Sequence, residues 1–374
     1  STGRTSPMYL ALRDLRATKG RFVLVGVVIG LISFLATMLA GLANGLVDDG
    51  ISGLRALPIT HLAFAENSHA SFSRSVMTED QLEAFDVEGV DATPVGVSFV
   101  NARPAGPDAS GETIDVALFG VDGNGFLAQS SEAPDGTDVA AAIEGGLVLS
   151  DELETEVDLG EEFTIVGTDT TLPVVGFTFA GTYGHVPIAF TSLDTWREVV
   201  YGDGSQGRFS AIALSTGDPA ALDSAATQTG TEVFTKSEAY AGSPGFSAES
   251  GTMSLIRGFL LVISALVVGA FFTVWTIQRT RQIGLLKALG ASSGYIVRDA
   301  LGQLAVVLVL SVSAGAAIAA GVGSLFGDGA PFSLTLSSVV ATALVLGLVG
   351  MAGSLVALRR IISVDPAISL TSGV

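Results

Sequence analysis

The stretch GFLLVISALVVGAFFTVWTIQ, residues 258–278, decides the fold of this chain. It contains no Asp, Glu, Lys or Arg, and about 20 apolar residues suffice to cross the hydrocarbon core of a bilayer. Three further stretches are equally free of these charges: residues 22–47, 300–327 and 329–358. Buried helices of a soluble protein are rarely so long without a charge. The sequence therefore predicts a membrane protein with four spans.

The segment RTRQIGLLKALGA, residues 279–291, follows that span directly. Ile283, Leu286 and Leu289 recur every three residues, which predicts one apolar side on a short helix. Arg and Lys residues make the same helix basic. Such a helix between two spans suits a cytoplasmic partner, although a positive flank that only orients the protein would also explain its charge.

Charge is segregated along the chain, which has a mean hydropathy of +0.57 yet a formal charge of −19. Residues 48–252 hold 33 acidic and six basic residues, a balance of −27. Most of the remaining Lys and Arg residues lie before the first span, between the second and third spans, and after the fourth. Lys and Arg mark the cytoplasmic side, so we expect both termini inside and the large insert outside.

The chain is thus expected to be a four-span α-helical membrane protein with an α+β extracytoplasmic domain inserted between spans 1 and 2. Short alternating segments predict strands at 95–100, 114–119, 147–150, 163–166, 172–179 and 211–214, and helices are expected at 78–85, 151–157, 192–201 and 218–229. A return linker is expected over 235–252. The expected segments are a cytoplasmic amphipathic entry helix (8–21), TM1 (22–47), the extracytoplasmic domain (48–252), TM2 (253–278), a cytoplasmic helix and loop (279–299), TM3 (300–327), a short extracellular loop (328–334), TM4 (335–358) and a cytoplasmic tail (359–374).

Small residues on the first span, Gly26, Gly30, Ala36 and Ala40, are spaced by four within each pair and predict a close helix packing face. Residues 1–7 are expected to be a cloning remnant ahead of a start at Met8. No cleavable signal peptide is expected, because the first span is too long and lacks a cleavage pattern.

The sequence offers little for catalysis. No G-x-x-x-x-G-K-[ST] motif occurs, so the chain is not expected to hydrolyse ATP by itself. The chain has no cysteine, and its three histidines lie in unrelated contexts, so neither a catalytic residue nor a metal site is expected. Arg257, near the outer end of the second span and four residues after Met253, either extends to the membrane surface or faces a cavity and binds an anionic group.

Three motifs resemble the FtsX-like/MacB-type superfamily of ABC transporter permeases: LALRDLR at 10–16, the segment 279–291, and VDPA at 364–367. Segments 146–150, 172–177 and 187–192 are also similar to recurrent family segments. The resemblance covers nearly the whole chain. It implies a homodimeric permease in the bacterial cell membrane that works with two copies of a cytoplasmic ATPase, which bind ATP and Mg²⁺; no nucleic-acid partner is expected. The helix that would dock on that ATPase contains Gln282, Ile283, Leu286, Lys287, Ala288 and Gly290.

The size and plan of the chain are most similar to those of the haem-exporting HrtB-type permeases. The resemblance implies export of haem, or of a similar amphiphile that partitions into membranes. Arg257 would pair with a propionate, and a Met, His, Tyr or carboxylate would meet the iron. Candidate ligands are Met77, Met253, His69, His185 and Tyr183. An FtsX-like protein that regulates an extracytoplasmic enzyme without transport remains the alternative.

Overall fold

The computed structural model describes residues 19–106, 112–129, 138–204, 207–278, 290, 292–326 and 331–362. The chain divides into two compact units. Residues 1–45 and 251–374 form the first, here called the membrane unit. Leu46–Ser250 form the second, here called the inserted domain.

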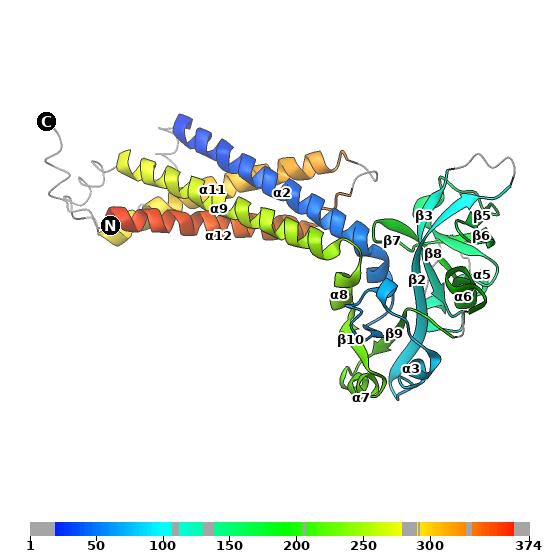
Figure 1. Cartoon of the computed structure of the whole chain (residues 1–374). Helices are drawn as coiled ribbons and strands as arrows, with labels where there is room; N and C mark the ends of the chain where they lie inside the picture. The colour runs from blue at the N-terminus through cyan, green and yellow to red at the C-terminus, as the bar shows by residue number, and fades with distance from the viewer. Residues whose placement is uncertain are drawn as a thin grey trace, which may run out of the picture. The chain divides into compact units, whose positions relative to one another are not determined.

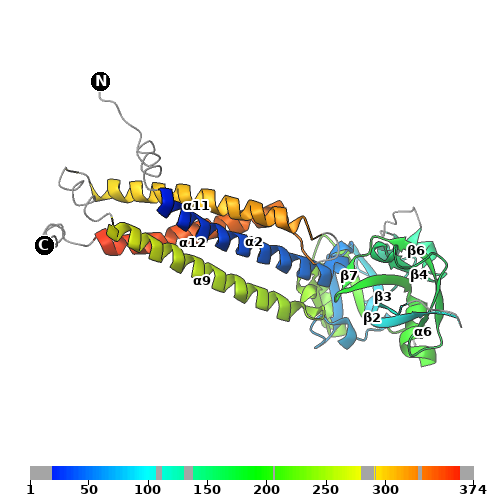
Figure 2. The same cartoon turned by 90° about the horizontal axis from the view of Figure 1, so that it is seen from above.

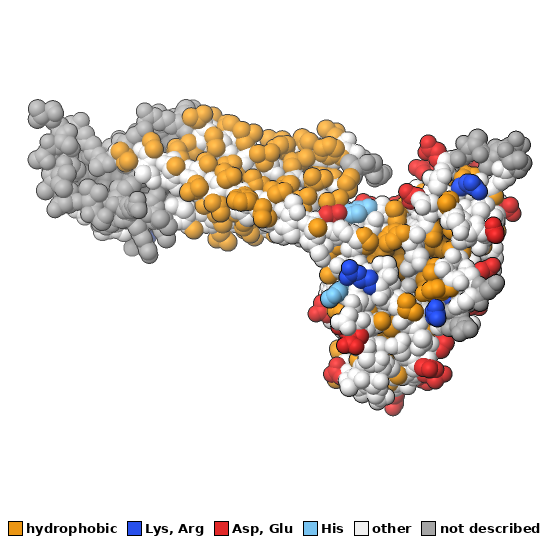
Figure 3. Space-filling view, in the orientation of Figure 1, with side chains coloured by type: hydrophobic (Ala, Val, Ile, Leu, Met, Phe, Trp, Pro, Cys, Tyr) orange, Lys and Arg blue, Asp and Glu red, His pale blue; other side chains and the backbone are white. Residues whose placement is uncertain are grey.

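The membrane unit is built from long apolar helices, which lie side by side in Figures 1 and 2. Hydrophobic side chains cover their visible surface (Figure 3), as expected for helices whose solvent is lipid. In the described part of the chain four of these helices could cross a membrane, over Val23–Ala56, Phe246–Phe271, Leu301–Gly323 and Leu336–Gly353. The helices are α2 (Lys19–Ala56), α9 (Phe246–Gln278), α11 (Ser293–Gly323) and α12 (Leu336–Ile362).

Close packing of α2 against α11 depends on glycine. A Cβ atom on Gly315 would overlap the carbonyl oxygen of Gly30, and a Cβ on Gly26 would approach Ser311 Oγ to 3.0 Å. Ser33 Oγ donates a hydrogen bond of 2.9 Å to the carbonyl oxygen of Val312 in the same contact. The small-residue face predicted at Gly26 and Gly30 is therefore found, and its partner is α11.

The inserted domain is built on a mixed sheet in the order β10-β1-β9-β2-β3-β8-β4-β6-β5, with β7 paired to β8. The β3–β8 and β4–β6 pairs are parallel, and β2 also pairs with β5. Strands β2, β3, β8, β4, β6 and β5 therefore form a closed ring. The strands are β1 (His61–Ala65), β2 (Val90–Pro104), β3 (Ile114–Val121), β4 (Leu147–Ser150), β5 (Glu162–Ile165), β6 (Thr171–Thr178), β7 (Thr182–Tyr183), β8 (Val186–Ser192), β9 (Ala211–Thr216) and β10 (Thr231–Thr235).

Short helices connect the strands of the sheet. The side chain of Ser192 accepts a hydrogen bond from the backbone N–H of Thr195, so α6 begins where the sequence predicts a helix start. The helices are α3 (Glu79–Glu83), α4 (Phe126–Gln129), α5 (Val139–Ala142), α6 (Leu193–Tyr201), α7 (Ala220–Thr229) and α8 (Lys236–Ala239), with single 3₁₀ turns η1 (Phe72–Arg74), η2 (Asp151–Leu153), η3 (Gly202–Gly204) and η4 (Tyr240–Gly242).

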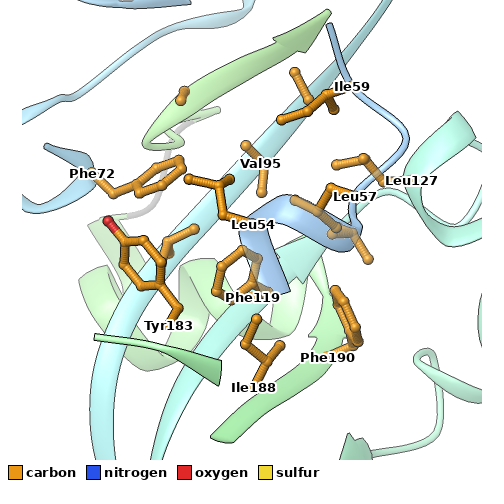
Figure 4. Close-up of a cluster of buried hydrophobic side chains, with 14 of the residues drawn as sticks. Leu54, Leu57, Ile59, Phe72, Val95, Phe119, Leu127, Tyr183, Ile188 and Phe190 are labelled. Atoms are coloured by element: carbon orange, nitrogen blue, oxygen red, sulfur yellow. The ribbon is translucent and has the colours of Figure 1, made fainter. Parts of the chain in front are cut away.

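One core of the inserted domain encloses the end of α2. Leu54 and Leu57 lie among Phe119, Ile188 and Phe190, and Leu54 is fully buried (Figure 4). Helix α2 is continuous from Lys19 to Ala56, so the same helix that begins in the membrane unit ends inside this core. Burial of its last apolar side chains explains why the helix continues beyond Val47, the last residue of the expected span.

The predicted fold class is confirmed, and the six predicted strand segments overlap β2, β3, β4, β5, β6 and β9. Two local predictions were wrong. Residues 151–157 form only the 3₁₀ turn η2 instead of a helix, and α9 begins at Phe246, inside the expected linker. The acidic residues of 151–157 are mostly solvated, and only two apolar side chains, Leu153 and Val157, are buried there.

Candidate functional site

An apolar cavity of about 350 Å³ lies within the membrane unit between α2, α9 and α12. This volume is in the range of small-molecule sites, which combine apolar walls with a few polar groups. Its polar groups come from Asn44, Arg257, Ser338 and Thr342. The lining residues are Ala36, Ala40, Asn44, Arg257, Leu260, Leu261, Ser338, Ala341, Thr342, Val345 and Leu346.

Arg257 supplies the positive charge of this cavity. Its Nη2 donates to the carbonyl oxygen of Ala40 at 3.4 Å and to Oδ1 of Asn44 at 3.3 Å. These contacts hold the guanidinium with neutral acceptors. Among the described residues, no carboxylate forms an ion pair with Arg257. Its charge is therefore available to an anionic ligand.

Met253 lies one helical turn before Arg257 on α9 and is partly buried. It is absent from the described residues that line the cavity. The two residues therefore lie one turn apart on the same helix, as predicted, but only the side chain of Arg257 contributes to the cavity wall.

A histidine in the inserted domain joins two helices. His185 Nδ1 lies 2.8 Å from Oδ2 of Asp49, near the end of α2. Its Nε2 lies 3.1 Å from Oε1 of Glu249, in the first turn of α9. With a carboxylate on each ring nitrogen, the doubly protonated imidazolium satisfies both contacts as a donor. We call Asp49, His185 and Glu249 the histidine clasp.

The turn that presents His185 is strained for an ordinary side chain. Gly184 and His185 connect β7 to β8, and both have positive φ, 61° and 67°. Two consecutive residues with positive φ form a two-residue hairpin turn whose backbone twist matches the twist of the flanking strands. Residues other than glycine seldom adopt a positive φ. The backbone N–H of Gly184 also donates to the carbonyl oxygen of Gly50 at 2.9 Å, and that of Thr182 donates to Ser52 Oγ at 2.9 Å, so several hydrogen bonds fix the hairpin to α2.

Burial by itself lowers the pKa of His185, but the hydrogen bond that its ring donates to Asp49 and the negative charges of Glu249 and Asp49 outweigh this effect. The result is a pKa above the ordinary histidine value. The clasp therefore favours a charged imidazole, a state that ties both helices to the hairpin.

Tyr183, on the same hairpin as His185, lies in the core of the inserted domain. Its ring stacks on Phe99 with centroids 5.8 Å apart and meets Phe72 edge-on at 5.6 Å. Burial raises the pKa of its phenol far above the usual range, although a hydrogen bond with Ser243 opposes the shift. An iron-binding phenolate is therefore disfavoured at this position.

Met77 and His69 occupy contrasting positions. Met77 is fully buried in a core cluster. Its backbone pairs with that of Phe209 through two hydrogen bonds, with N···O distances of 2.8 and 3.2 Å. In this conformation its sulfur has no access to a ligand. His69 is exposed in a turn with φ of 55°.

Several members of these sites were missed from the sequence. Asn44 lies near the end of the first apolar run, Asp49 follows that run, and Glu249 precedes the second, so the sequence alone marked them only as flanking residues of spans. The signal that could have identified these residues was their position, since all three are polar and lie near the ends of two predicted spans. The predicted docking residues Gln282, Ile283, Leu286, Lys287 and Ala288 lie outside the described residues, while Gly290 is described and has φ of 93°, which suits glycine.

Comparison with known proteins identifies the C-terminal part. Residues 254–366 match the model of the FtsX-like permease C-terminal family. A protein of Staphylococcus epidermidis named hemin transport system permease protein HrtB is 21% identical over 368 residues, covering 98% of this chain and 100% of that protein. Its namesake in Staphylococcus haemolyticus is 22% identical, covering 96% of this chain and 98% of that protein.

Relatives also occur among mycobacteria. An uncharacterized ABC transporter permease of Mycobacterium tuberculosis is 24% identical over 379 residues, covering 96% of this chain and 98% of that protein. Among solved structures, the extracellular domain of the noncanonic ABC-type transporter YknZ from Gram-positive bacteria matches 47% of this chain and 98% of that chain, with 16% identity and a TM-score of 0.34. Residues 254–366 of this chain therefore form an FtsX-like permease C-terminal domain, and proteins similar to nearly the whole chain are named ABC transporter or hemin transport permeases.

Proposed function

We propose that this permease exports haem, or a similar amphiphile that partitions into membranes, as part of an efflux pump. A separate ATPase subunit binds ATP with Mg²⁺ and supplies the energy. The observation that carries the proposal is the apolar cavity of the membrane unit, in which Arg257 provides one positive charge. The hemin transport names of the staphylococcal relatives support the same cargo.

The cavity suits an apolar body with an anionic group. Leu260, Leu261 and Val345 offer hydrocarbon surface, and burial of such surface contributes about 25 cal/mol per Å². A propionate would replace the neutral oxygens of Ala40 and Asn44 as the acceptor for Arg257. Hydrogen bonds between two charged partners contribute about 1.5–3 kcal/mol.

The described lining of the cavity contains no His, Met, Tyr or Cys. Haem binding in this cavity would depend on apolar contacts with the macrocycle and on the pairing of a propionate with Arg257, without a strong bond to iron. Weak ligation suits a cargo that must leave again. Among the ligand candidates, Met253 is closest to Arg257 in sequence, whereas His69, His185 and Tyr183 belong to the inserted domain.

The assembly that we propose is a homodimer with two ATPase subunits in the bacterial cell membrane. Both termini and residues 279–299 lie in the cytoplasm, and the inserted domain is extracytoplasmic, as the distribution of Lys and Arg favours. The helix of this chain that docks on the ATPase contains Gln282, Ile283, Leu286, Lys287, Ala288 and Gly290.

Hemin and its dimethyl ester, which lacks both carboxylates, test the cavity. Full-length protein in detergent is titrated with each compound, and the Soret band is followed. Arg257→Gln should weaken hemin binding about tenfold or more and leave ester binding unchanged. Arg298→Gln, at an exposed cation on α11, is the matched control. Equal losses for both compounds, or no saturable hemin binding at all, would refute the site.

A second candidate function is mechanical control of an extracytoplasmic enzyme without transport. The continuity of α2 from Lys19 to Ala56, with Leu54 in the core of the inserted domain, favours it. Hemin-stimulated ATP hydrolysis by the reconstituted complex separates the two functions. Stimulation supports export, and indifference to hemin supports mechanical control.

A further inference from the structure

A second cleft, of about 380 Å³, lies in the inserted domain, where β2, α6 and the segment around η1 meet. Five aromatic and five serine residues contribute to its lining. Hydrophobic side chains gather over β2 on the visible face of this domain (Figure 3). The lining consists of Ser71, Phe72, Ser73, Ser75, Val76, Val97, Ser98, Phe99, Tyr183, Trp196, Val200, Tyr201, Ser210, Gly242 and Pro244.

The cleft borders a gap in the sheet. Strand β2 pairs with β3 over residues 95–102, but on its other side it pairs with β9 over 90–95 and with β5 over 102–104. On that side Ser210 N donates to Val95 O at 3.0 Å, Val97 N donates to Ser210 Oγ at 3.0 Å, and Val166 N donates to Asn101 O at 2.9 Å.

Alternate residues of a strand direct both backbone groups to the same side. The N–H and C=O of Phe99 therefore point into the gap, between the groups of Val97 and Asn101. On this side of β2 the described strand pairings end at Val95 and resume at Ala102, and no other described hydrogen bond involves either group of Phe99. An unpaired N–H and C=O on a sheet edge are a template for another strand.

The side chains around this edge are unusually apolar for a surface. Val76, Phe99 and Val200 are 51%, 45% and 38% exposed, and all three line the cleft. Trp196 is almost fully buried, yet its Nε1 lacks a hydrogen-bond acceptor among the described atoms.

A positive charge stands beside the cleft. The guanidinium of Arg208 lies over the ring of Tyr201, 5.7 Å from its centroid. Neighbouring Arg197 is paired with Glu79 and Asp194, whereas no described carboxylate pairs with Arg208. In a domain with so large an acidic excess, this free cation favours a carboxylate on the occupant.

We propose that the cleft binds an extended polypeptide segment of a partner protein. One residue of the segment exchanges two hydrogen bonds with the N–H and C=O of Phe99. The side chain of this residue lies on the same face of β2 as Phe99, beside Tyr183. The side chains of its two neighbours point to the opposite face, toward α6, where an apolar one lies against Val200 and Tyr201 and an acidic one meets Arg208. This docking site is separate from the cavity at Arg257 and goes beyond the proposed export of an amphiphile.

The backbone geometry favours a polypeptide over a small amphiphile. A carboxylate can accept from the Phe99 N–H, but it offers no donor to the Phe99 C=O. A residue in extended conformation presents a donor and an acceptor on the same side, at the spacing that an edge strand requires. The combination of serine and aromatic side chains is also typical of surfaces that recognise polypeptides.

Trp196 provides the reporter for the test, since the chain has only two tryptophans. Full-length protein carrying Trp275→Phe is titrated in detergent with five pentapeptides, acetyl-Thr-Val-X-Asp-Thr-amide, in which X is Val, Leu, Ile, Phe or Tyr. At least one should change Trp196 emission in a saturable manner. The same peptide N-methylated at X keeps its side chain but loses the donor to Phe99, and should bind at least tenfold more weakly.

Val200→Phe should fill the cleft and abolish the response, whereas Leu159→Phe, at a residue 65% exposed and outside the cleft, should preserve it. Arg257→Gln should leave peptide binding unchanged, which separates this site from the cavity of the membrane unit. No saturable response to any of the five peptides, equal binding of the N-methylated peptide, or unchanged binding to the Val200→Phe protein would each overturn the proposal.

Discussion

Asp49 and His185 are 136 residues apart in the chain, yet Oδ2 of the first lies 2.8 Å from Nδ1 of the second. The contact attaches the β7–β8 hairpin to α2, and Glu249 attaches the same imidazole to α9. Both helices continue from the inserted domain into the membrane unit. The histidine clasp thus holds together the two chain segments that enter and leave the inserted domain.

Protonation of His185 should stabilise the inserted domain. Its folded pKa is raised above the ordinary value of 6.5, so the stabilisation is fully present below about pH 6.5 and is lost as the pH rises through the folded pKa. Since the ring is 29% exposed, the loss should be below about 1 kcal/mol, or about 2–4 °C in Tm. Thermal unfolding of the full-length Trp275→Phe protein between pH 5.5 and 9, followed by Trp196 fluorescence, measures this loss.

The control for this pH dependence is His185→Asn, because asparagine tolerates positive φ and keeps the turn. The variant should lose the pH-dependent part of the Tm, and Asp49→Asn should reduce it. An unchanged pH profile in His185→Asn would show that another group is responsible.

Removal of the α2 side chain at the centre of the core should destabilise the inserted domain strongly. Leu54→Ala leaves a cavity at a fully buried position, which costs about 2–5 kcal/mol. Leu159→Ala, at an exposed leucine, should cost less than about 0.5 kcal/mol. Denaturant unfolding of the two full-length variants, both made in the Trp275→Phe protein and read from Trp196 emission, compares their stability. Similar midpoints would contradict the burial of Leu54.

A methyl group at Gly315 should disrupt the contact between α2 and α11. Gly315→Ala places a Cβ on the carbonyl oxygen of Gly30, where backbone must move to admit it. Gly302→Ala on the same helix meets no atom within 4 Å and should be tolerated. Thermal aggregation in detergent should begin at a lower temperature for Gly315→Ala alone. Equal behaviour of the two variants would argue against this helix contact.

A charge in the proposed docking helix should separate the permease from its ATPase. Leu286→Asp introduces a carboxylate on the apolar side predicted from the sequence, and it should abolish co-purification of the co-expressed ATPase and stimulation of ATP hydrolysis. Leu286→Met preserves the apolar surface and should keep both. Docking through this helix is disproved if Leu286→Asp retains the ATPase.

The membrane helices could be predicted because their signal is local and long. More than 20 consecutive residues without charge leave few alternatives to a span. Strands such as Leu147–Ser150 were also predictable from alternation and flanking turns. Strands β1, β7, β8 and β10 were not predicted; the partners of β1, for example, lie far along the chain, at residues 212–214 and 231–235.

The sites were less predictable than the fold, since they depend on contacts between distant segments. Arg257 was selected because a cation beside a span is conspicuous, and it does line a cavity. His185 was selected as an iron ligand, but its two carboxylate partners come from segments that read as ordinary acidic flanks. Met77 illustrates the opposite error, because local sequence gave no sign that its side chain is fully buried.

Continuity of α2 has a consequence for its rotational phase. Each residue turns an α-helix by about 100°, so the direction of Leu54 is set by the number of residues that precede it in the helix. One alanine inserted after Val47 would turn Leu54 away from its core if the upstream part kept its orientation. Four inserted residues would restore its direction to within about 40°. The direction of Leu54 within its core therefore depends on the number of residues that precede it in α2.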